Sequence, residues 1–286
     1  MELDSVLSLG NSVVRLTVSG ASDVGNVRSI NEDSFLAGPA VFLVADGMGG
    51  HAHGDLASAA VVRVFSVRHA RESWTNSAAV LASISEANTA VRSLTPSDAR
   101  DEAIAGTTLT GIALLDTQDG GSPSWIAFNV GDSRIYSWRE GCLEQITVDH
   151  SAVQELVDLG KITREEAEVH PERNVVTRAI GVDDDPDADV WLLPAGGEQL
   201  FLLCSDGLSK ELSDKRIADL LSEAVIADPV PSIASRLVDA AVAAGGRDNV
   251  TVVVVKAEWD VVNAGTSTPT SVAGMPAFLE ETAPRK

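Results

Sequence analysis

The sequence has little cysteine, few aromatic residues and few basic ones. Only two of its 286 residues are cysteines, Cys142 and Cys204, and they have neither the spacing of metal ligands nor that of a disulfide framework. Aromatic residues make up 4% of the chain, so the core has to be built mainly from Ala, Val, Leu and Ile. Hydrophobic residues still reach 44%, which suffices for one large domain or two modest ones.

The shortage of basic residues limits the classes of partner. The chain has 21 basic and 42 acidic residues, a formal net charge of -21, which argues against binding to nucleic acid or to an anionic membrane surface. It also lacks an uninterrupted apolar stretch of about 18 residues and a basic segment before an apolar one at its start. We therefore expect a cytoplasmic protein with no nucleic-acid or membrane partner.

Short Val-rich runs bounded by Gly, Asp, Ser or Pro predict several strands, and apolar residues at helical spacing predict helices between them. The runs between residues 107 and 139 follow one another with only turn residues between them, which favours antiparallel sheets with helices outside. Residues 1–258 are expected to form a single domain. Residues 259–286, rich in Thr, Ser, Pro and Gly, are expected to be a disordered tail. The helices are expected over 54–70, 77–94, 151–159, 163–169, 213–224 and 231–244.

Four aspartates stand at an end of a strand-like apolar run: Asp46, Asp132 and Asp206 are next to a glycine, and Asp248 follows the sequence GGR. Any one of them alone is most simply a turn residue. Strand ends of one sandwich can converge, however, and carboxylates at close range repel one another and have to be protonated or neutralised. Together the four predict a site for divalent metal.

The predicted ligands are all oxygen donors, so the site should prefer a hard cation, Mn²⁺ or Mg²⁺. A bridging carboxylate can hold two such ions about 3.5–4 Å apart, and a water between them loses its proton near neutral pH. Gly47, directly after Asp46, could offer a backbone carbonyl as a ligand, because glycine allows an unusual turn and leaves open space.

A polar segment, residues 22–34, precedes the strand that leads to Asp46. It could be a solvated loop with an ion pair between Arg28 and Glu32, four residues apart. Beside a metal site, Arg28 becomes a candidate phosphate clamp, since a guanidinium offers a bidentate fork to phosphoryl oxygens. Asp33 then becomes a further ligand to metal or to metal-bound water.

Two competing motifs are weaker. GMGGHA, residues 47–52, matches the dinucleotide-binding fingerprint of a nicotinamide-dependent oxidoreductase. Asp46 would, however, set its charge beside the pyrophosphate, and about 20 residues later no strand ending in an acidic residue follows. His51 and His53 suggest zinc, but no further ligand follows at a suitable spacing.

Seven motifs in order, between about residues 19 and 256, resemble the bacterial branch of the metal-dependent Ser/Thr protein phosphatases of type 2C, the PPM family. They are DVGNVRSINED, ADGMGGH, AGTTLT, NVGDSRIY, TVDHS, CSDGL and GGRDNVT. The resemblance implies an α+β fold: a central β-sandwich of two antiparallel sheets flanked by helices on both faces. It also implies a flap segment at about residues 149–178 that lies beside the cleft and influences substrate choice.

The resemblance implies roles for the metal ligands. Asp46 corresponds to the carboxylate that bridges two ions, and Gly47 to the ligand that acts through its carbonyl. Asp206 and Asp248 complete the second metal, while Asp132 together with Asp206 holds a third, more weakly bound ion. Asp33 acts on the metals directly or through water.

The resemblance also implies the reaction. Arg28 grips the phosphate of phosphoserine or phosphothreonine in a protein, and a metal-activated water attacks phosphorus in a single step without a phosphoenzyme. Met48 stands where animal relatives have a histidine acid, so His51, His53 and metal-bound water remain candidate proton donors. The substrates would be proteins phosphorylated by Ser/Thr kinases in signalling, and the enzyme would be a monomer. The alternative is a catalytically silent regulator that binds phosphoproteins.

Overall fold

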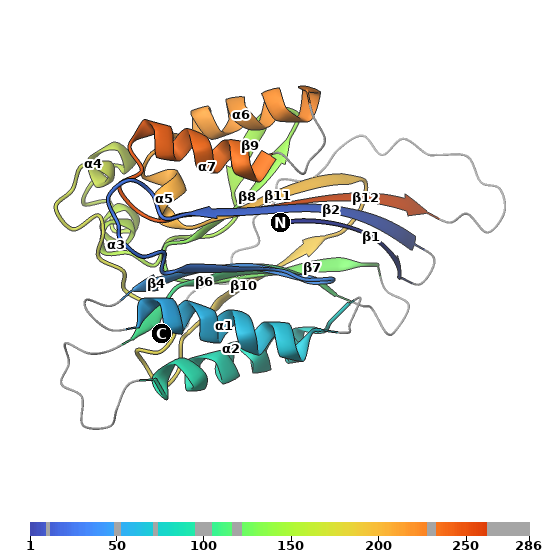
Figure 1. Ribbon diagram of the computed structural model, residues 1–286, viewed down its shortest axis with the longest axis horizontal. Coiled ribbons are helices and arrows are strands. Elements are labelled where there is room, and N and C mark those ends of the chain that lie inside the picture. The colour runs from blue at the N-terminus through green and yellow to red at the C-terminus, as the bar shows by residue number, and fades with distance from the viewer. Residues whose placement is uncertain are drawn as a thin grey trace.

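The computed structural model describes residues 1–9, 12–48, 53–70, 74–94, 105–115, 122–227 and 233–261. Two antiparallel sheets pack face to face, and helices cover both outer faces, so that four layers are stacked (Figure 1). This α-β-β-α architecture confirms the fold expected from the sequence.

One sheet has the strand order β1-β2-β12-β11-β8-β9 and the other β10-β7-β6-β4-β3, with β5 paired to β4. The strands of the first sheet are β1 (Glu2–Leu9), β2 (Ser12–Asp23), β12 (Val250–Val261), β11 (Glu198–Cys204), β8 (Arg134–Arg139) and β9 (Cys142–Gln145). Those of the second are β10 (Asp189–Pro194), β7 (Ser124–Val130), β6 (Leu109–Leu115), β4 (Val41–Met48) and β3 (Asp33–Ala37), with β5 at Gly106–Thr107.

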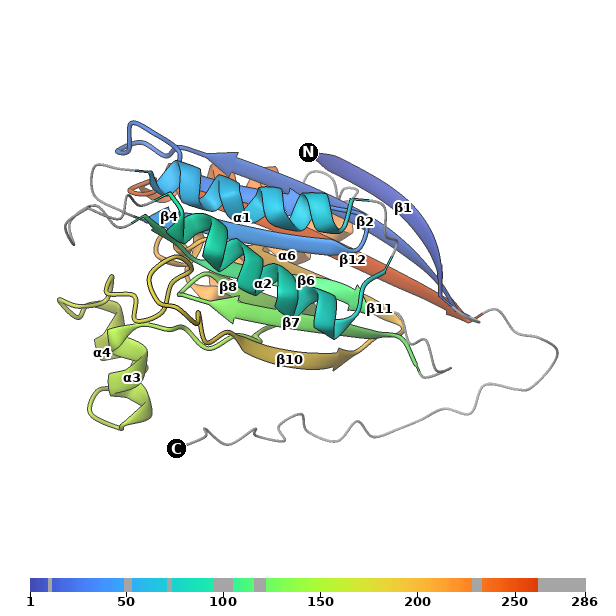
Figure 2. The ribbon, with the colours of Figure 1, turned by 90° about the horizontal axis from the view of Figure 1, so that it is seen from below.

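Helices cover the two outer faces and one end of the sandwich. The helices α1 (Gly54–Arg68) and α2 (Ser77–Arg92) lie across the second sheet (Figure 2). The first sheet is covered by α6 (Asp214–Ala227) and α7 (Ile233–Ala244), and the short α5 (Asp206–Ser209) follows β11. Two further short helices, α3 (Ala152–Asp158) and α4 (Arg164–Glu168), lie at one end of the sandwich in both views.

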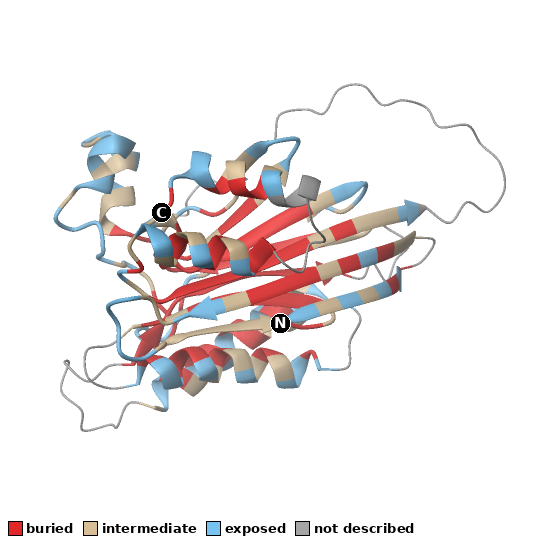
Figure 3. Cartoon of the chain, turned by 45° about the horizontal axis from the view of Figure 1, so that its top comes forward, coloured by how far each residue is buried: buried red, intermediate tan, exposed pale blue. Residues whose placement is uncertain are grey.

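Three apolar layers hold the stack together, and the middle one lies between the sheets. There Phe42, Trp125 and Phe201 are buried, and the ring centroids of Trp125 and Phe201 are 5.5 Å apart. Beneath α1, Phe65 stacks on Phe128 at 5.6 Å. The buried interior runs along both sheets, whereas the outer faces of the helices are exposed (Figure 3). Burial of this aliphatic and aromatic surface is the main stabilising contribution.

The structure adds elements that the sequence patterns did not predict: β1, β9 and α5. The apolar run over 35–45 is two strands, β3 and β4, because a turn at Gly38 separates them. β12 continues to Val261, three residues past the expected boundary at 258. The single domain and the tail remain predictions, and residues 262–286 lie outside the described residues.

The sheet pairing removes the dinucleotide-binding alternative. β4, which precedes the glycine motif, pairs antiparallel with β3, β5 and β6. The fingerprint requires a parallel βαβ unit. Among the helices in the described ranges, none is long and apolar enough to cross a membrane.

Candidate metal centre

The alternation of side chains along β4 and β3 places two aspartates at one end of the layer between the sheets. On β4, Phe42 and Val44 belong to this middle layer, and Asp46 follows at the same two-residue period. Phe35 on β3 packs against the same layer, and Asp33 precedes it by two residues. Asp33 and Asp46 are direct register partners in the antiparallel pair.

Buried hydroxyl groups hold the backbone of Asp46 and the carboxylate of Asp33. The Asp46 backbone N–H donates to Oγ1 of Thr108 at 2.9 Å, and Thr108 shares a 2.7 Å hydrogen bond with Ser133. Ser205 donates through its hydroxyl to Oδ2 of Asp33 at 2.8 Å. At this end of the sandwich, hydroxyl groups therefore lie between the apolar layer and the carboxylates.

Asp206 and Asp248 come from neighbouring strands of the first sheet. Asp206 opens α5, two residues after β11 ends, and Asp248 lies two residues before β12 begins. β11 and β12 are antiparallel, so the end of one lies beside the start of the other. Asp132 follows β7 of the second sheet by two residues and is only 6% exposed. Both sheets therefore contribute carboxylates.

Asp46 lies within electrostatic range of the other four aspartates. Burial raises the pKa of Asp46 well above its usual value, and the charges of Asp33, Asp206, Asp132 and Asp248 raise it further. The five side chains predicted as ligands from distant positions are brought together. We refer to them below as the aspartate cluster.

The other buried members of the cluster are affected in the same direction. Burial raises the pKa of Asp33 to about 7, against hydrogen bonds from Thr251 and Ser205 that lower it. Burial and the charge of Asp206 raise the pKa of Asp132 to about 7. Each shift reflects the cost of holding a negative charge in a site that is desolvated and already negative.

Two cationic side chains among the described residues offset part of this charge. Lys210 forms an ion pair through Nζ with Oδ2 of Asp206, four residues earlier. Arg28 donates from Nη2 to Oδ2 of Asp248 at 2.9 Å, and its side chain is 49% exposed. The alternative pairing of Arg28 with Glu32 is therefore wrong as a hydrogen-bonded contact, although Glu32 still acts on Arg28 through its charge.

The donor set fits a hard divalent cation. Oδ1 of Asp33 and Oδ1 of Asp206 are buried and accept no hydrogen bond from any described residue. Such orphaned oxygens are costly unless a cation or water uses them. No group of three or more His, Cys, Asp and Glu side chains within the described ranges is already arranged as a metal site, however. Lys210 and Arg28 instead hold two of the carboxylates.

Gly47 meets a different structural demand from the one expected. It lies within β4 and not in an unusual turn. A Cβ at this position would overlap the carbonyls of Gly54 and Glu32, so glycine is required because three backbone segments meet there. The role of its own carbonyl as a ligand remains a prediction.

Asn249, which the sequence patterns did not single out, fixes the segment that carries Arg28. Its Nδ2 donates to the carbonyls of Val24 and Ile30, both at 3.0 Å, and its Oδ1 accepts the N–H of Glu32 at 2.8 Å. The position of Asn249 directly after the candidate ligand Asp248 was the only sequence signal for these three hydrogen bonds, which we call the Asn249 clamp.

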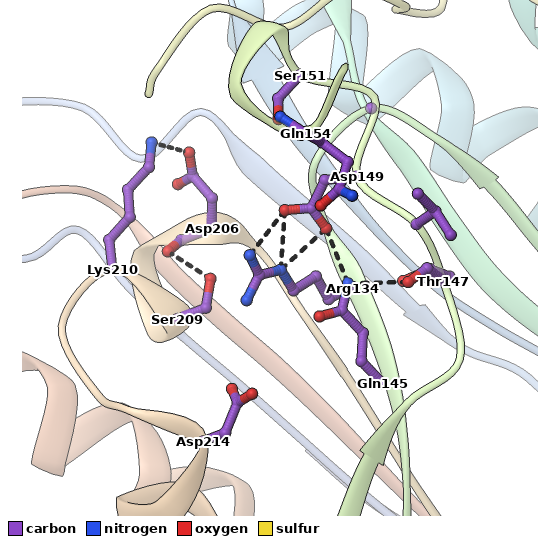
Figure 4. A network of polar contacts seen from close by, with 12 residues as sticks. Arg134, Gln145, Thr147, Asp149, Ser151, Gln154, Asp206, Ser209, Lys210 and Asp214 are labelled. Atoms are coloured by element: carbon purple, nitrogen blue, oxygen red, sulfur yellow. Dashed lines mark hydrogen bonds and ion pairs between the residues drawn. The ribbon is translucent and has the colours of Figure 1, made fainter. Parts of the chain in front are cut away.

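The base of the predicted flap, residues 149–178, is anchored by a part-buried ion pair. Arg134 donates to both carboxylate oxygens of Asp149, with contacts of 2.7–3.0 Å (Figure 4). Arg134 also donates from Nη1 to the hydroxyl of Tyr136 at 3.0 Å, and that hydroxyl donates to Asp214 on α6 at 3.2 Å. The segment that leads into the flap is thereby tied to both β8 and α6.

His150 ties the same segment to the loop that carries Asp132. The ring nitrogen Nδ1 of His150 accepts the backbone N–H of Gly131 at 3.1 Å. The backbone N–H of His150 donates to the Gly131 carbonyl at 2.9 Å. Because Nδ1 accepts, Nε2 carries the proton toward Asp189 Oδ2 at 3.2 Å. The two ends of the flap also pair, through Ala152 N–H to Val175 O at 2.9 Å.

The candidate proton donors are only partly placed. His53 precedes α1 and has a positive φ of 84°. Met48 ends β4. His51 lies outside the described residues, so the identity of the donor stays open.

Known proteins are similar to this chain in both sequence and fold. The family model of protein phosphatase 2C matches residues 26–257. Serine/threonine protein phosphatase PstP of Mycobacterium tuberculosis is 40% identical over 241 residues, which are 84% of this chain and 44% of that protein. The chain thus spans less than half the length of this relative. Protein phosphatase PhpP of Streptococcus pneumoniae is 34% identical over 84% of this chain and 97% of its own.

A solved structure agrees with the described fold. The catalytic domain of serine/threonine protein phosphatase PstP, in complex with two manganese ions, superposes with a TM-score of 0.71 at 36% identity. The superposition covers 86% of this chain and 99% of that one. Taken with the family match over most of the sequence, these likenesses show that the chain belongs to the protein phosphatase 2C family, in its bacterial PPM branch.

Proposed function

We propose that this protein hydrolyses phosphoserine and phosphothreonine in other proteins and depends on Mn²⁺ or Mg²⁺. The observation that carries the proposal is the aspartate cluster, to which both sheets contribute carboxyl groups at one end of the sandwich. The pKa values of Asp33, Asp46, Asp132 and Asp206 are raised, and one buried oxygen each of Asp33 and Asp206 accepts no hydrogen bond from a described residue. The names of the PstP and PhpP relatives support protein dephosphorylation as the reaction.

The residues that would hold the metal are Asp33, Asp46, Asp206 and Asp248, with the Gly47 carbonyl, and Asp132 for a third, weaker ion. Bound there, the ions would lower the pKa of water so that it can attack phosphorus in a single step, and would neutralise phosphoryl charge. The all-oxygen donor set supports hard cations over zinc.

Arg28 would bind the phosphoryl group. It is half exposed, sits on a segment fixed by Asn249, and contacts the cluster through Asp248. Its present ion pair is a surface contact of small net energy, so it can exchange Asp248 for a dianionic phosphate at little cost. The flap, anchored by Asp149 and His150 beside Asp132, would shape the protein-binding side of the cleft.

The proposal is tested by phosphopeptide hydrolysis with the full chain, with MnCl₂, with EDTA, and with Asp206→Asn. Asp219→Asn, which changes a half-exposed acidic residue of α6 outside the cluster, is the matched control. We expect activity with MnCl₂ that is lost in EDTA and in Asp206→Asn, and retained in Asp219→Asn. Equal turnover in EDTA would contradict the proposal.

The alternative, a silent regulator that binds phosphoproteins, is not favoured, because every predicted ligand is present in the cluster. Absence of hydrolysis under any metal, together with phosphopeptide binding, would restore it. A monomeric state, a cytoplasmic location and substrates made by Ser/Thr kinases in signalling remain predictions.

A further inference from the structure

Among the lysines whose ion pairs the structure describes, Lys210 is the one that contacts an aspartate of the cluster. It directly follows the short helix α5, whose first residue is Asp206, and its Nζ contacts Oδ2 of Asp206. The side chain is 32% exposed and that of Asp206 is 13% exposed. By contrast, Lys215 makes an ion pair of the same spacing with Asp219, but its side chain is 84% exposed.

The charge of Lys210 acts on more than one carboxylate. Besides Asp206, the carboxylates of Asp132 and Asp46 interact electrostatically with its ammonium group. Asp132 and Asp206 come from different sheets, and the charge of the Lys210 ammonium group lowers the pKa of both. It therefore lies on the side of the cluster where those two aspartates meet.

The backbone at Lys210 is fixed by contacts that do not involve its ammonium group. Its N–H donates to the Asp206 carbonyl at 2.8 Å, and its own carbonyl accepts from Nη2 of Arg247 at 3.2 Å. Arg247 also grips Glu211, with Nε to Oε1 at 2.9 Å, and the Glu211 side chain is only 4% exposed. The ammonium group is thus presented to the cluster from a well-anchored turn.

We propose that Lys210 is a built-in counter-ion that competes with a divalent cation for the Asp132 and Asp206 side of the cluster. The inference rests on the proposed function, because it concerns the same metal centre. An ion bound between Asp132 and Asp206 has to displace the ammonium group from Asp206, which weakens the binding of that ion. No described ion pair joins Lys210 to Asp33 or Asp248, so an ion held by these two residues is affected only through Asp206 and Asp46.

The test is a calorimetric titration of the metal-stripped full chain with MnCl₂ alone, which yields the number of ions and the dissociation constant of each. Lys210→Met removes the charge and keeps an apolar stem, and Lys210→Arg keeps the charge. Lys215→Met is the matched control, since it removes the lysine of an exposed pair with the same spacing and alters the net charge equally.

Removing the positive charge of Lys210 from this partly buried site should raise the affinity of the weakest ion by roughly tenfold or more. We expect Lys210→Met either to bind one more Mn²⁺ per chain than the wild type or to bind its weakest ion at least about tenfold more tightly. Lys210→Arg and Lys215→Met should titrate like the wild type. A Lys210→Met variant with unchanged or weaker Mn²⁺ binding overturns the inference.

Thermal unfolding covers the case in which the metal-free variant folds poorly. The metal-free cluster loses a neutralising charge in Lys210→Met, so its midpoint should fall in EDTA, and MnCl₂ should raise it more than it raises that of the wild type. A variant that stays unfolded with and without MnCl₂ would give Lys210 a structural role and reject the inference.

The outcome also separates this inference from the proposed function. If the wild type binds no Mn²⁺ and hydrolyses no phosphopeptide, both fail. If the wild type binds Mn²⁺ and is active, but Lys210→Met titrates identically, only the inference about Lys210 fails.

Discussion

Asp33 and Asp46 face each other directly across β3 and β4 at the end of the layer between the sheets. Two carboxylates in direct register repel each other, and both are largely withdrawn from water. The cost of this arrangement supports the proposal that these residues hold a cation.

The metal-free protein should lose stability as pH rises from about 4 to about 7. In the folded state the pKa of Asp33 and of Asp132 is raised to about 7, whereas the unfolded chain has an ordinary value near 3.9. The folded state therefore binds more protons in this window, so the free energy of unfolding falls with rising pH, by on the order of a few kcal/mol. Thermal unfolding in EDTA across this range measures the effect.

The rest of this acidic chain also titrates, so a variant has to isolate the contribution of the cluster. Asp33→Asn should flatten the pH dependence in EDTA and should raise stability at pH 7 relative to the wild type. With MnCl₂ the order should reverse, because the metal replaces the proton. A wild-type midpoint in EDTA that drops no more than that of Asp33→Asn would disprove this explanation.

Arg28→Ala should lower kcat/KM for a phosphopeptide by roughly 10²-fold, as expected when a bidentate contact to the phosphoryl group is lost. Mn²⁺ affinity should change little, and so should the melting temperature, because the pair with Asp248 is exposed. Arg28→Lys should recover only part of the loss, since an ammonium group lacks the planar fork. Unchanged kinetics in Arg28→Ala would remove this residue from the site.

Breaking the anchor between Arg134 and Asp149 should be among the more damaging single changes outside the cluster. Asp149→Ala leaves a part-buried guanidinium without its carboxylate, at a cost of about 3–5 kcal/mol by analogy with other buried pairs. The double variant Arg134→Met with Asp149→Ala should recover part of that stability. Denaturant unfolding decides, and a cost below about 1 kcal/mol would mean that the pair is dispensable.

His150→Ala should loosen the flap without unfolding the domain. The change removes the acceptor of the Gly131 N–H and the contact with Asp189. Limited proteolysis should then cut within residues 149–178 several times faster than in the wild type. His170→Ala, at a half-buried histidine whose described side-chain contact is local, with the N–H of Glu172, is the control and should be cut at the wild-type rate.

The sequence predicted the sandwich well because its signals are local. Val-rich runs such as the one that became β12, and the apolar face of α7, need no knowledge of the rest of the chain. β1 was missed because Ser5 and Val6 break its alternation of polar and apolar residues and because it is half exposed, as edge strands often are. α5 was missed because four residues carry no helical period.

The cluster could be predicted as a set, whereas the contacts around it could not. Asp46 and Asp206 follow apolar runs that predict strands. A residue in that position lies at the end of its strand, so its place in the sandwich can be predicted. The pairing of Arg28 with Asp248 and the clamp of Asn249 span more than 200 residues of sequence, so no local pattern contains them. The sequence alone would predict an ordinary surface position for Lys210, because its interaction with Asp132 depends on the fold.

The most direct test of the account is diffraction from crystals of the full chain soaked in MnCl₂, with anomalous differences measured to locate manganese. We predict at least two peaks enclosed by Asp33, Asp46, Asp206 and Asp248, each with carboxylate oxygens at bonding distance, and their absence in Asp46→Asn crystals. Peaks only on the outer surface, or an unchanged pattern in the variant, would contradict the claim that these aspartates form one metal centre.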